Sequence, residues 1–199
     1  MRPTQPATIA AALWPDTSAS VARYSRFAIL ALAGTLVLAV SAKAQVPFYP
    51  VPLTLQTLVV LVLGAAYGGR LAGATVALYL VEGAIGLPVF AGTPEKGLGL
   101  AYMMGPTGGF LAGFLFAAAL VGWCAERGWD RSIIKLTAVM AAGHAVIFAF
   151  GLSWLAYLIG WNKAWIGGAE PFIIATGVKT LLAAAIMPAL WKIMPRKAS

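Results

Sequence analysis

A few polar side chains stand inside long apolar runs of this 199-residue sequence, and their types limit the chemistry that is open to it. Glu82, His144 and Lys179 are ionisable, and Gln56 adds an amide. An ionisable side chain within a membrane span is costly, so each one raises a functional question. A lysine can receive an anionic ligand group, and a glutamine can both donate and accept a hydrogen bond. This set favours recognition of a ligand over bond-breaking chemistry.

Glu82 and Lys179 are predicted to lie at similar depth. Glu82 follows Arg70 by 12 residues, or ~18 Å of helix, and Lys179 follows Phe172 by 7 residues, or ~10 Å, on a helix that runs the other way. In a hydrocarbon core of roughly 30 Å both fall in the outer half, as does Gln56 near the start of its helix. We therefore expect an outward-facing pocket. The alternative for Glu82 and Lys179 is a structural ion pair between two helices.

His144 has no second histidine or nearby carboxylate with which to share a metal ion, so we expect a hydrogen-bonded packing residue. The sequence also lacks a Gly-x-x-x-x-Gly-Lys-Ser/Thr loop, a His-Glu-x-x-His motif and a cooperating Ser/His/Asp set. We therefore expect no catalytic residue, no metal and no cofactor. A membrane-embedded enzyme would need clustered acids, a histidine pair or an activated nucleophile in one pocket.

The composition predicts an all-α integral membrane protein. Hydrophobic residues make up 61% of the chain and charged residues 10%, against roughly 45–50% and about 25% in ordinary globular domains. A single cysteine, Cys124, excludes an intramolecular disulfide. Six apolar runs are predicted as transmembrane helices: Phe27–Ala44, Thr54–Tyr67, Leu71–Leu87, Thr107–Cys124, Leu136–Ile159 and Phe172–Ile193.

The positive charges predict the orientation of these helices. With the N-terminus inside, 10 of the 14 Lys and Arg residues lie on inner segments, three on outer segments, and Lys179 lies within a span. Both termini are thus predicted to be cytoplasmic. The net charge of +8 reports this orientation rather than a nucleic-acid partner. Residues 1–22 are predicted as a cytoplasmic tail, with a cleaved signal as the alternative, 23–195 as one six-helix domain, and 196–199 as a second tail.

Two outer loops are predicted to close the pocket. Residues 46–52 hold three prolines, which exclude a helix and favour a stiff, strand-like segment. Residues 88–106, here called the lid loop, are long and rich in glycine, and such loops are often functional lids. A plain solvated linker is the alternative. Gly109, Gly113 and Ala117 form part of a row of small residues that we expect to pack within the chain's own bundle.

Three blocks of sequence are similar to those of the BioY family, the biotin-binding S components of energy-coupling factor (ECF) transporters. They are Pro50-Val51-Pro52-Leu53-Thr54-Leu55-Gln56-Thr57-Leu58, then Tyr79-Leu80 followed by Gly83 to Gly92, and Gly105-Pro106-Thr107-Gly108-Gly109-Phe110 continuing to Phe114. The resemblance implies a multi-pass protein of the bacterial cytoplasmic (inner) membrane that captures biotin from outside. It implies two kinds of partner, a transmembrane coupling subunit and a pair of cytoplasmic ATP-binding cassette ATPases.

The resemblance also implies the site residues. Gln56, Thr176 and loop amides would serve the ureido group of biotin, with Tyr49 and Phe90 against its rings and Lys179 on the ureido oxygen or the carboxylate. The substrate-binding set is completed by Glu82, Lys96 and Gly97. The sequence departs from the family at Thr176, where aspartate is usual, and at residues 93–97, which replace a run of glycines.

A row of small residues on the first helix is implied as the docking face for the coupling subunit: Ala31, Thr35 and Ala39. Ordinary packing within the bundle is the alternative for that row. For the whole chain, two further functions stay open. One is an S component for another small vitamin, and the other is a structural membrane subunit without a ligand.

Overall fold

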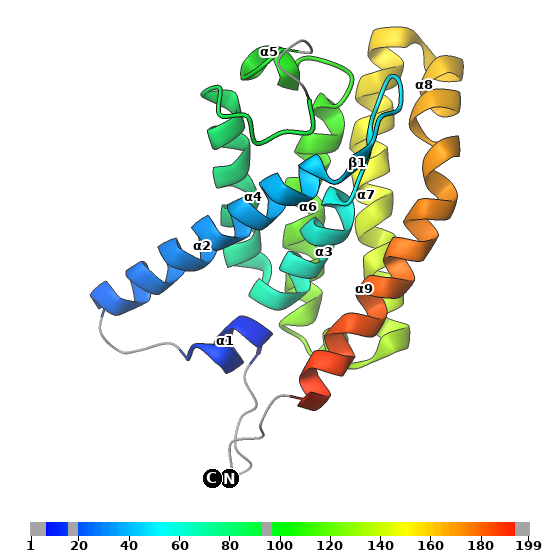
Figure 1. Cartoon of the computed structure of the whole chain (residues 1–199). Coiled ribbons are helices and arrows are strands. Elements are labelled where there is room, and N and C mark those ends of the chain that lie inside the picture. Colours follow the sequence, from blue (N-terminus) through cyan, green and yellow to red (C-terminus); the bar gives the residue numbers. More distant parts are fainter. Residues whose placement is uncertain (1–6, 16–19, 93–96, 194–199) are drawn as a thin grey trace.

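The structure is a computed structural model that describes residues 7–15, 20–92 and 97–193. It is a bundle of long helices with short elements at its two ends (Figure 1). The long helices are α2 (Ser20–Lys43), α3 (Gln56–Tyr67), α4 (Gly69–Ala84), α6 (Gly108–Ala125), α7 (Ile133–Ile159) and α9 (Ile173–Ile193). The short elements are α1 (Ile9–Leu13), β1 (Gln45–Val46), β2 (Leu53–Thr54), α5 (Leu100–Met103), η2 (Trp129–Arg131), α8 (Trp161–Gly168) and η3 (Glu170–Phe172).

Each of the six predicted apolar runs coincides with one long helix, although several boundaries differ. Helix α2 begins at Ser20, inside the segment that the sequence assigns to a tail. Over the described residues, four segments are long and apolar enough to cross a membrane: Ser20–Lys43, Gly108–Ala125, Ile133–Ile159 and Trp161–Ile193. Helices α3 and α4 have 12 and 16 residues, or about 18 and 24 Å, which is short of a core of roughly 30 Å.

Helix α6 lies at the centre and packs against α3, α4 and α7. Its small residues permit this close approach. A Cβ on Gly109 would lie 2.5 Å from the carbonyl oxygen of Phe150, and one on Gly113 would lie 2.9 Å from the Cα of Ile147. Neither position has room for a side chain. The row of small residues therefore packs inside the chain's own bundle, as predicted.

The two ends of the bundle differ in structure. At one end, here called the loop end, lie the β1–β2 hairpin, α5 and α8 (Figure 1). The hairpin pairs Gln45 with Thr54 and Val46 with Leu53, so residues 47–52 form its turn. The segment is not helical, as predicted, but the extended strands lie at its two ends rather than along it. At the other end, the α1 end, lie α1, η2 and the last turn of α9.

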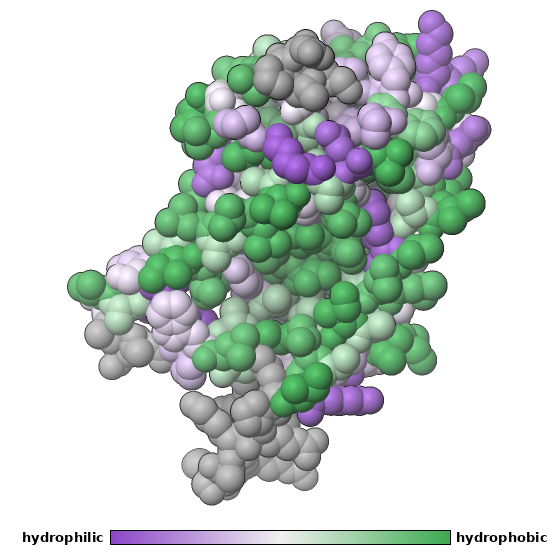
Figure 2. Space-filling model, in the orientation of Figure 1, coloured by the Kyte–Doolittle hydropathy of each residue, from purple (hydrophilic) through white to green (hydrophobic). Residues whose placement is uncertain are grey.

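The surface of the long helices is apolar. Figure 2 shows hydrophobic residues across the middle of one face and hydrophilic residues mostly toward the two ends. Large exposed hydrophobic side chains on α2 and α9 include Leu36, Val40, Ile174 and Leu181, each more than 60% exposed. A surface of this kind is stable against lipid and not against water.

Candidate functional site

A small cavity lies at the loop end, where six segments meet. Its walls come from the hairpin, α3, the lid loop, α6, α7 and the start of α9. The polar residues on it are Thr54, Gln56, Thr57, Tyr102, Thr107, Thr176 and Lys179. The cavity measures about 50 Å³, whereas pockets for small ligands usually measure 300–1,000 Å³. A vitamin-sized ligand therefore needs the walls of the cavity to move apart.

Lys179 supplies the positive charge of this cavity. Its side chain comes from α9 and is only 8% exposed. The ammonium donates to the carbonyl oxygen of Thr54 at 2.6 Å and to the hydroxyl of Thr57 at 3.3 Å. Because an ammonium has three N–H donors, one donor stays available for a ligand acceptor. The carbonyl at the end of β2 thus holds the lysine in place before any ligand arrives.

Gln56 presents an acceptor to the same cavity. Its Nε2 atom donates to the hydroxyl of Tyr79 at 2.6 Å, and that hydroxyl donates to the carbonyl oxygen of Val89 at 2.8 Å. The hydroxyl has one proton, which it gives to Val89, so it must accept from Gln56. The amide of Gln56 is fixed in one orientation, and its Oε1 atom accepts a long hydrogen bond of 3.5 Å from the hydroxyl of Thr54. Because an amide oxygen has two lone pairs, Oε1 can accept a second hydrogen bond from a ligand N–H.

The apolar wall of the cavity is aromatic. The ring centroids of Phe110 and Phe148 lie 6.1 Å apart, those of Phe148 and Phe172 lie 6.4 Å apart, and both pairs meet edge to face. All three residues line the cavity. Sequence reasoning did not select them, although Phe110 lies within the third block of resemblance and Phe172 lies just ahead of the α9 residues that were chosen. The position of Phe110 in that block, and the nearness of Phe172 to Thr176 and Lys179 in the sequence, were the available signals.

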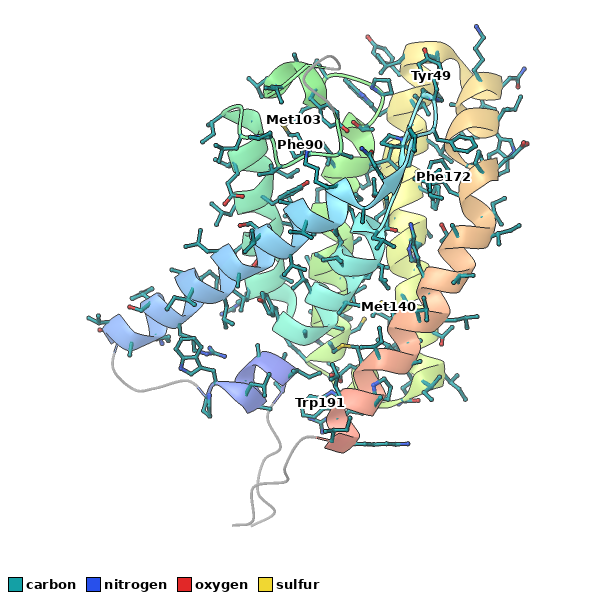
Figure 3. All side chains as sticks on the ribbon, viewed as in Figure 1. Tyr49, Phe90, Met103, Met140, Phe172 and Trp191 are labelled. Atoms are coloured by element: carbon teal, nitrogen blue, oxygen red, sulfur yellow. The ribbon has the colours of Figure 1, made fainter. Side chains whose placement is uncertain are left out.

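The structure corrects the predicted placement of three residues. Glu82 does not line the cavity, because it faces α2 and accepts a hydrogen bond of 3.1 Å from the hydroxyl of Thr35. Phe90 is 4% exposed and lies in the core between Tyr79 and Tyr102. Tyr49 is 86% exposed in the turn of the hairpin, at the loop end (Figure 3), and does not line the cavity. Glu82 was placed by its depth along a helix, and Phe90 and Tyr49 by the family resemblance. The direction in which each of these side chains points depends on tertiary packing.

Glu82 and Lys179 also do not form the ion pair that was the alternative. Each has a different neutral partner, on α2 for Glu82 and on β2 and α3 for Lys179. In the lid loop, Lys96 lies outside the described residues. Gly97 has a positive φ of 87° and lies beside Ala101 rather than on the cavity wall.

His144 is a packing residue, as predicted. It is 2% exposed, and its Nδ1 atom lies 3.1 Å from the carbonyl oxygen of Met140 and 3.0 Å from the hydroxyl of Thr180. The contact with Thr180 links α7 to α9. No group of three or more metal-ligating side chains occurs among the residues that the structure describes.

The predicted docking face on α2 lies largely against the chain's own bundle. Ala31 and Thr35 are each 5% exposed, and Ala39 is partly buried. Gly34, on the same face, comes so close to α4 that a Cβ there would lie 2.5 Å from a methyl group of Thr75. In this structure the small residues serve packing within the bundle, which was the alternative.

Comparison with known proteins gives one consistent family. A family model described as "BioY family" matches residues 15–196. A relative from Pyrococcus horikoshii, named "Probable biotin transporter BioY", is 40% identical over 147 residues, which cover 74% of this chain and 85% of the relative. A relative from Rhizobium etli, named "Biotin transporter BioY", is 36% identical over 148 residues, or 70% of this chain and 77% of the relative.

A solved structure has a similar fold. It is titled as the S-component for biotin from an ECF-type ABC transporter, and it superposes with a TM-score of 0.73. The match covers 88% of this chain and 95% of that chain, at 23% identity. At 23% identity, this match is evidence for a shared fold alone.

Proposed function

The chain belongs to the BioY family, and from that premise we propose that it is the biotin-binding substrate-capture subunit, or S component, of an ECF-type biotin uptake transporter. The observation that carries this proposal is the pairing of a donor and an acceptor in one cavity. Lys179 offers an N–H and Gln56 offers Oε1, and both contact Thr54. This pair is complementary to a ligand that carries a carbonyl oxygen beside an N–H.

The ureido group of biotin has this arrangement. Its oxygen would accept from the ammonium of Lys179, and one ureido N–H would donate to Oε1 of Gln56. Thr176 lies on the same wall and can donate or accept one further hydrogen bond. The sulfur-containing ring is apolar and suits the wall formed by Phe110, Phe148 and Phe172. A buried site rejects analogues that leave its polar groups unpaired. The aromatic wall together with the Lys179–Gln56 pair therefore favours biotin over molecules that lack the ureido group.

The orientation in the membrane follows from the distribution of charge. Among the described residues, the α1 end carries Arg23, Arg26, Arg70, Arg127, Arg131, Lys135 and Lys192, whereas the loop end carries Lys43 and Lys163. By the positive-inside rule, this distribution supports an orientation with the α1 end and both termini in the cytoplasm and the cavity outside. All six long helices cross the bacterial inner membrane, with the short α3 and α4 shielded by neighbouring helices.

Transport needs partners that supply energy, because the chain lacks a nucleotide-binding motif. A transmembrane coupling subunit and two ATP-binding cassette ATPases fill this role. Since Ala31 and Thr35 are covered by the chain's own α4, the coupling subunit docks on the exposed face of α2, where Ala39 is partly accessible beside Leu36 and Val40. The relatives from Pyrococcus horikoshii and Rhizobium etli are both named as biotin transporters.

Calorimetric titration of the detergent-purified chain with biotin tests the proposal. Riboflavin and thiamine serve as controls, because they are vitamins with different ring systems and different hydrogen-bonding patterns. Saturable binding of one biotin per chain, without binding of the controls, is the expected result. Saturable binding of a control instead would assign the chain to another vitamin. No binding of any of the three would favour a structural membrane subunit and contradict the capture function.

A further inference from the structure

Helix α1 lies in the space between the start of α2 and the rest of the bundle. The first half of α2 runs away from the other long helices, and α1 lies beneath it, beside the lower end of α3 (Figure 1). Over residues 20–29 of α2, every side chain is exposed except that of Arg26. This half of the helix is therefore an overhang that the other long helices do not cover. Helix α1 also lies outside residues 15–196, which the family model matches.

One side of α1 is buried against the bundle. Thr8, Ile9 and Ala10 are buried, and Ile9 belongs to the hydrophobic core. Thr8 packs against the turn between α3 and α4, where a Cβ on Gly68 would lie 3.1 Å from the methyl group of Thr8. The other side of α1 faces outward, since Leu13 is exposed. A helix of five residues is not stable by itself in water, so these contacts hold it in place.

Arg26 joins α2 to α1. Its side chain is buried, and Nη2 donates to the carbonyl oxygen of Ala10 at 3.1 Å. A buried guanidinium is costly unless acceptors meet its donors, and a backbone carbonyl is such an acceptor. Helix α1 thus supplies a polar contact to the overhang of α2 and an apolar contact to the core. The two contacts lie on neighbouring residues, Ile9 and Ala10, so α1 bridges the space between them.

We propose that α1 is a strut that fixes the position of the first half of α2 relative to the bundle. The second half of α2 is held by its own packing, with Gly34 close to Thr75 on α4. Where the two halves meet, the hydroxyl of Tyr67 donates to the carbonyl oxygen of Leu30 at 3.0 Å. Beyond this point α1 is the support of the overhang. The coupling subunit is proposed to dock on the exposed face of α2, so on that function the strut also sets the angle of the docking face.

Two pairs of variants test the strut, each with a matched control on the same helix. Ile9→Asn places a polar group on the buried side of α1, and Leu13→Asn makes a similar change on its exposed side. Arg26→Ala removes both the donors and the length by which α2 reaches α1. Arg23→Ala makes the same change at an exposed position of α2. Thermal unfolding and hydrogen exchange in α7 show that the bundle of each variant is folded.

Two measurements on the detergent-purified chain report on the strut. Hydrogen exchange of the peptide that spans residues 7–15 shows whether α1 is docked. Pulsed electron paramagnetic resonance gives the distance between spin labels at Val21→Cys, in the first turn of α2, and Lys135→Cys, in the first turn of α7. Both sites are exposed, and the labels are introduced in a Cys124→Ala background.

Ile9→Asn and Arg26→Ala are expected to undock α1 and release the overhang. Burial of an isoleucine side chain is lost in the first variant, so exchange of residues 7–15 should accelerate roughly tenfold or more. Val21 lies 9 residues before Leu30, or ~14 Å along the helix, so a change in tilt of roughly 15° moves the label by about 4 Å. The mean distance between the labels is expected to shift by this amount, and the distribution to broaden. Leu13→Asn and Arg23→Ala are expected to change neither measurement.

A shift of less than half this size in both strut variants would overturn the proposal, even if α1 undocks, because α1 would then rest on the bundle without positioning α2. An equal shift in the two controls would overturn it as well. Neither measurement needs biotin or a partner subunit. A chain that binds no biotin would therefore contradict the capture function and leave the test of the strut intact.

Discussion

Replacing Lys179 by methionine tests the chemistry of the cavity most directly. Methionine keeps the length of the side chain and removes its three donors. Lys179 is nearly buried and already sits within 2.6 Å of a fixed carbonyl oxygen, so little reorganisation is needed when it binds a ligand acceptor. A hydrogen bond from a charged donor contributes about 1.5–3 kcal/mol. At about 1.4 kcal/mol per tenfold change, the expected loss of biotin affinity is roughly 10- to 150-fold.

The same substitution is expected to change the stability of the protein little. It removes two hydrogen bonds, to the carbonyl oxygen of Thr54 and the hydroxyl of Thr57, which is unfavourable. It also removes the cost of keeping a charge away from water, which is favourable. The two effects oppose each other, so the melting temperature in detergent should stay near that of the unmodified chain. Binding and folding are then separable in this variant.

The measurement is calorimetric titration of Lys179→Met with biotin, together with thermal unfolding in the same detergent. Lys163→Met serves as the control, because it makes the same chemical change on the exposed surface of α8. A dissociation constant for biotin within twofold of the unmodified chain, in a folded variant, would refute the assignment of Lys179 to the site. A large loss of affinity in the control would show that net charge, rather than position, is responsible.

Three further outcomes follow from the structure. Gly113→Val should lower the melting temperature by several degrees, because a Cβ there meets the backbone of α7 at 2.9 Å, and an unchanged melting temperature would contradict the tight α6–α7 packing. Asp130 is fully buried, and its carboxylate accepts a hydrogen bond from the indole N–H of Trp191. Burial raises the pKa of this carboxyl above the ordinary 3.8. The folded state then binds the proton more tightly than the unfolded state, so this carboxyl favours folding at low pH and loses that contribution as pH rises through the raised pKa. Asn at this position does not titrate, so the drop in melting temperature between pH 4 and pH 7 should be smaller in Asp130→Asn than in the unmodified chain. An equal drop in both proteins would disprove the contribution of Asp130 to the pH dependence of stability. For topology, an impermeant maleimide added to intact cells should label Lys163→Cys and spare Lys135→Cys, with the buried Cys124 as low background, and the reverse pattern would invert the orientation.

The sequence alone was sufficient to locate the long helices and part of the site. Apolar runs of membrane-spanning length are a strong signal because lipid demands them, and each predicted run coincides with a helix. Gln56 and Lys179 were selected as polar residues among apolar ones, Thr176 was selected from the family resemblance, and all three line the cavity. A polar group in such a run must find a partner, so its presence marks either a site or a packing contact, as His144 shows.

The tertiary structure decided which way the other chosen side chains face. Glu82 and Lys179 were predicted to line one pocket because they lie at similar depth, yet packing of α2 against α4 turns Glu82 toward Thr35. Phe90 was expected against the ligand, but the space left by Gly83 draws its ring into the core. Depth follows from counting residues along one helix, whereas the rotation of each helix follows from how all of them pack. That rotation, which also turns Arg26 toward α1, exists only once the bundle has formed.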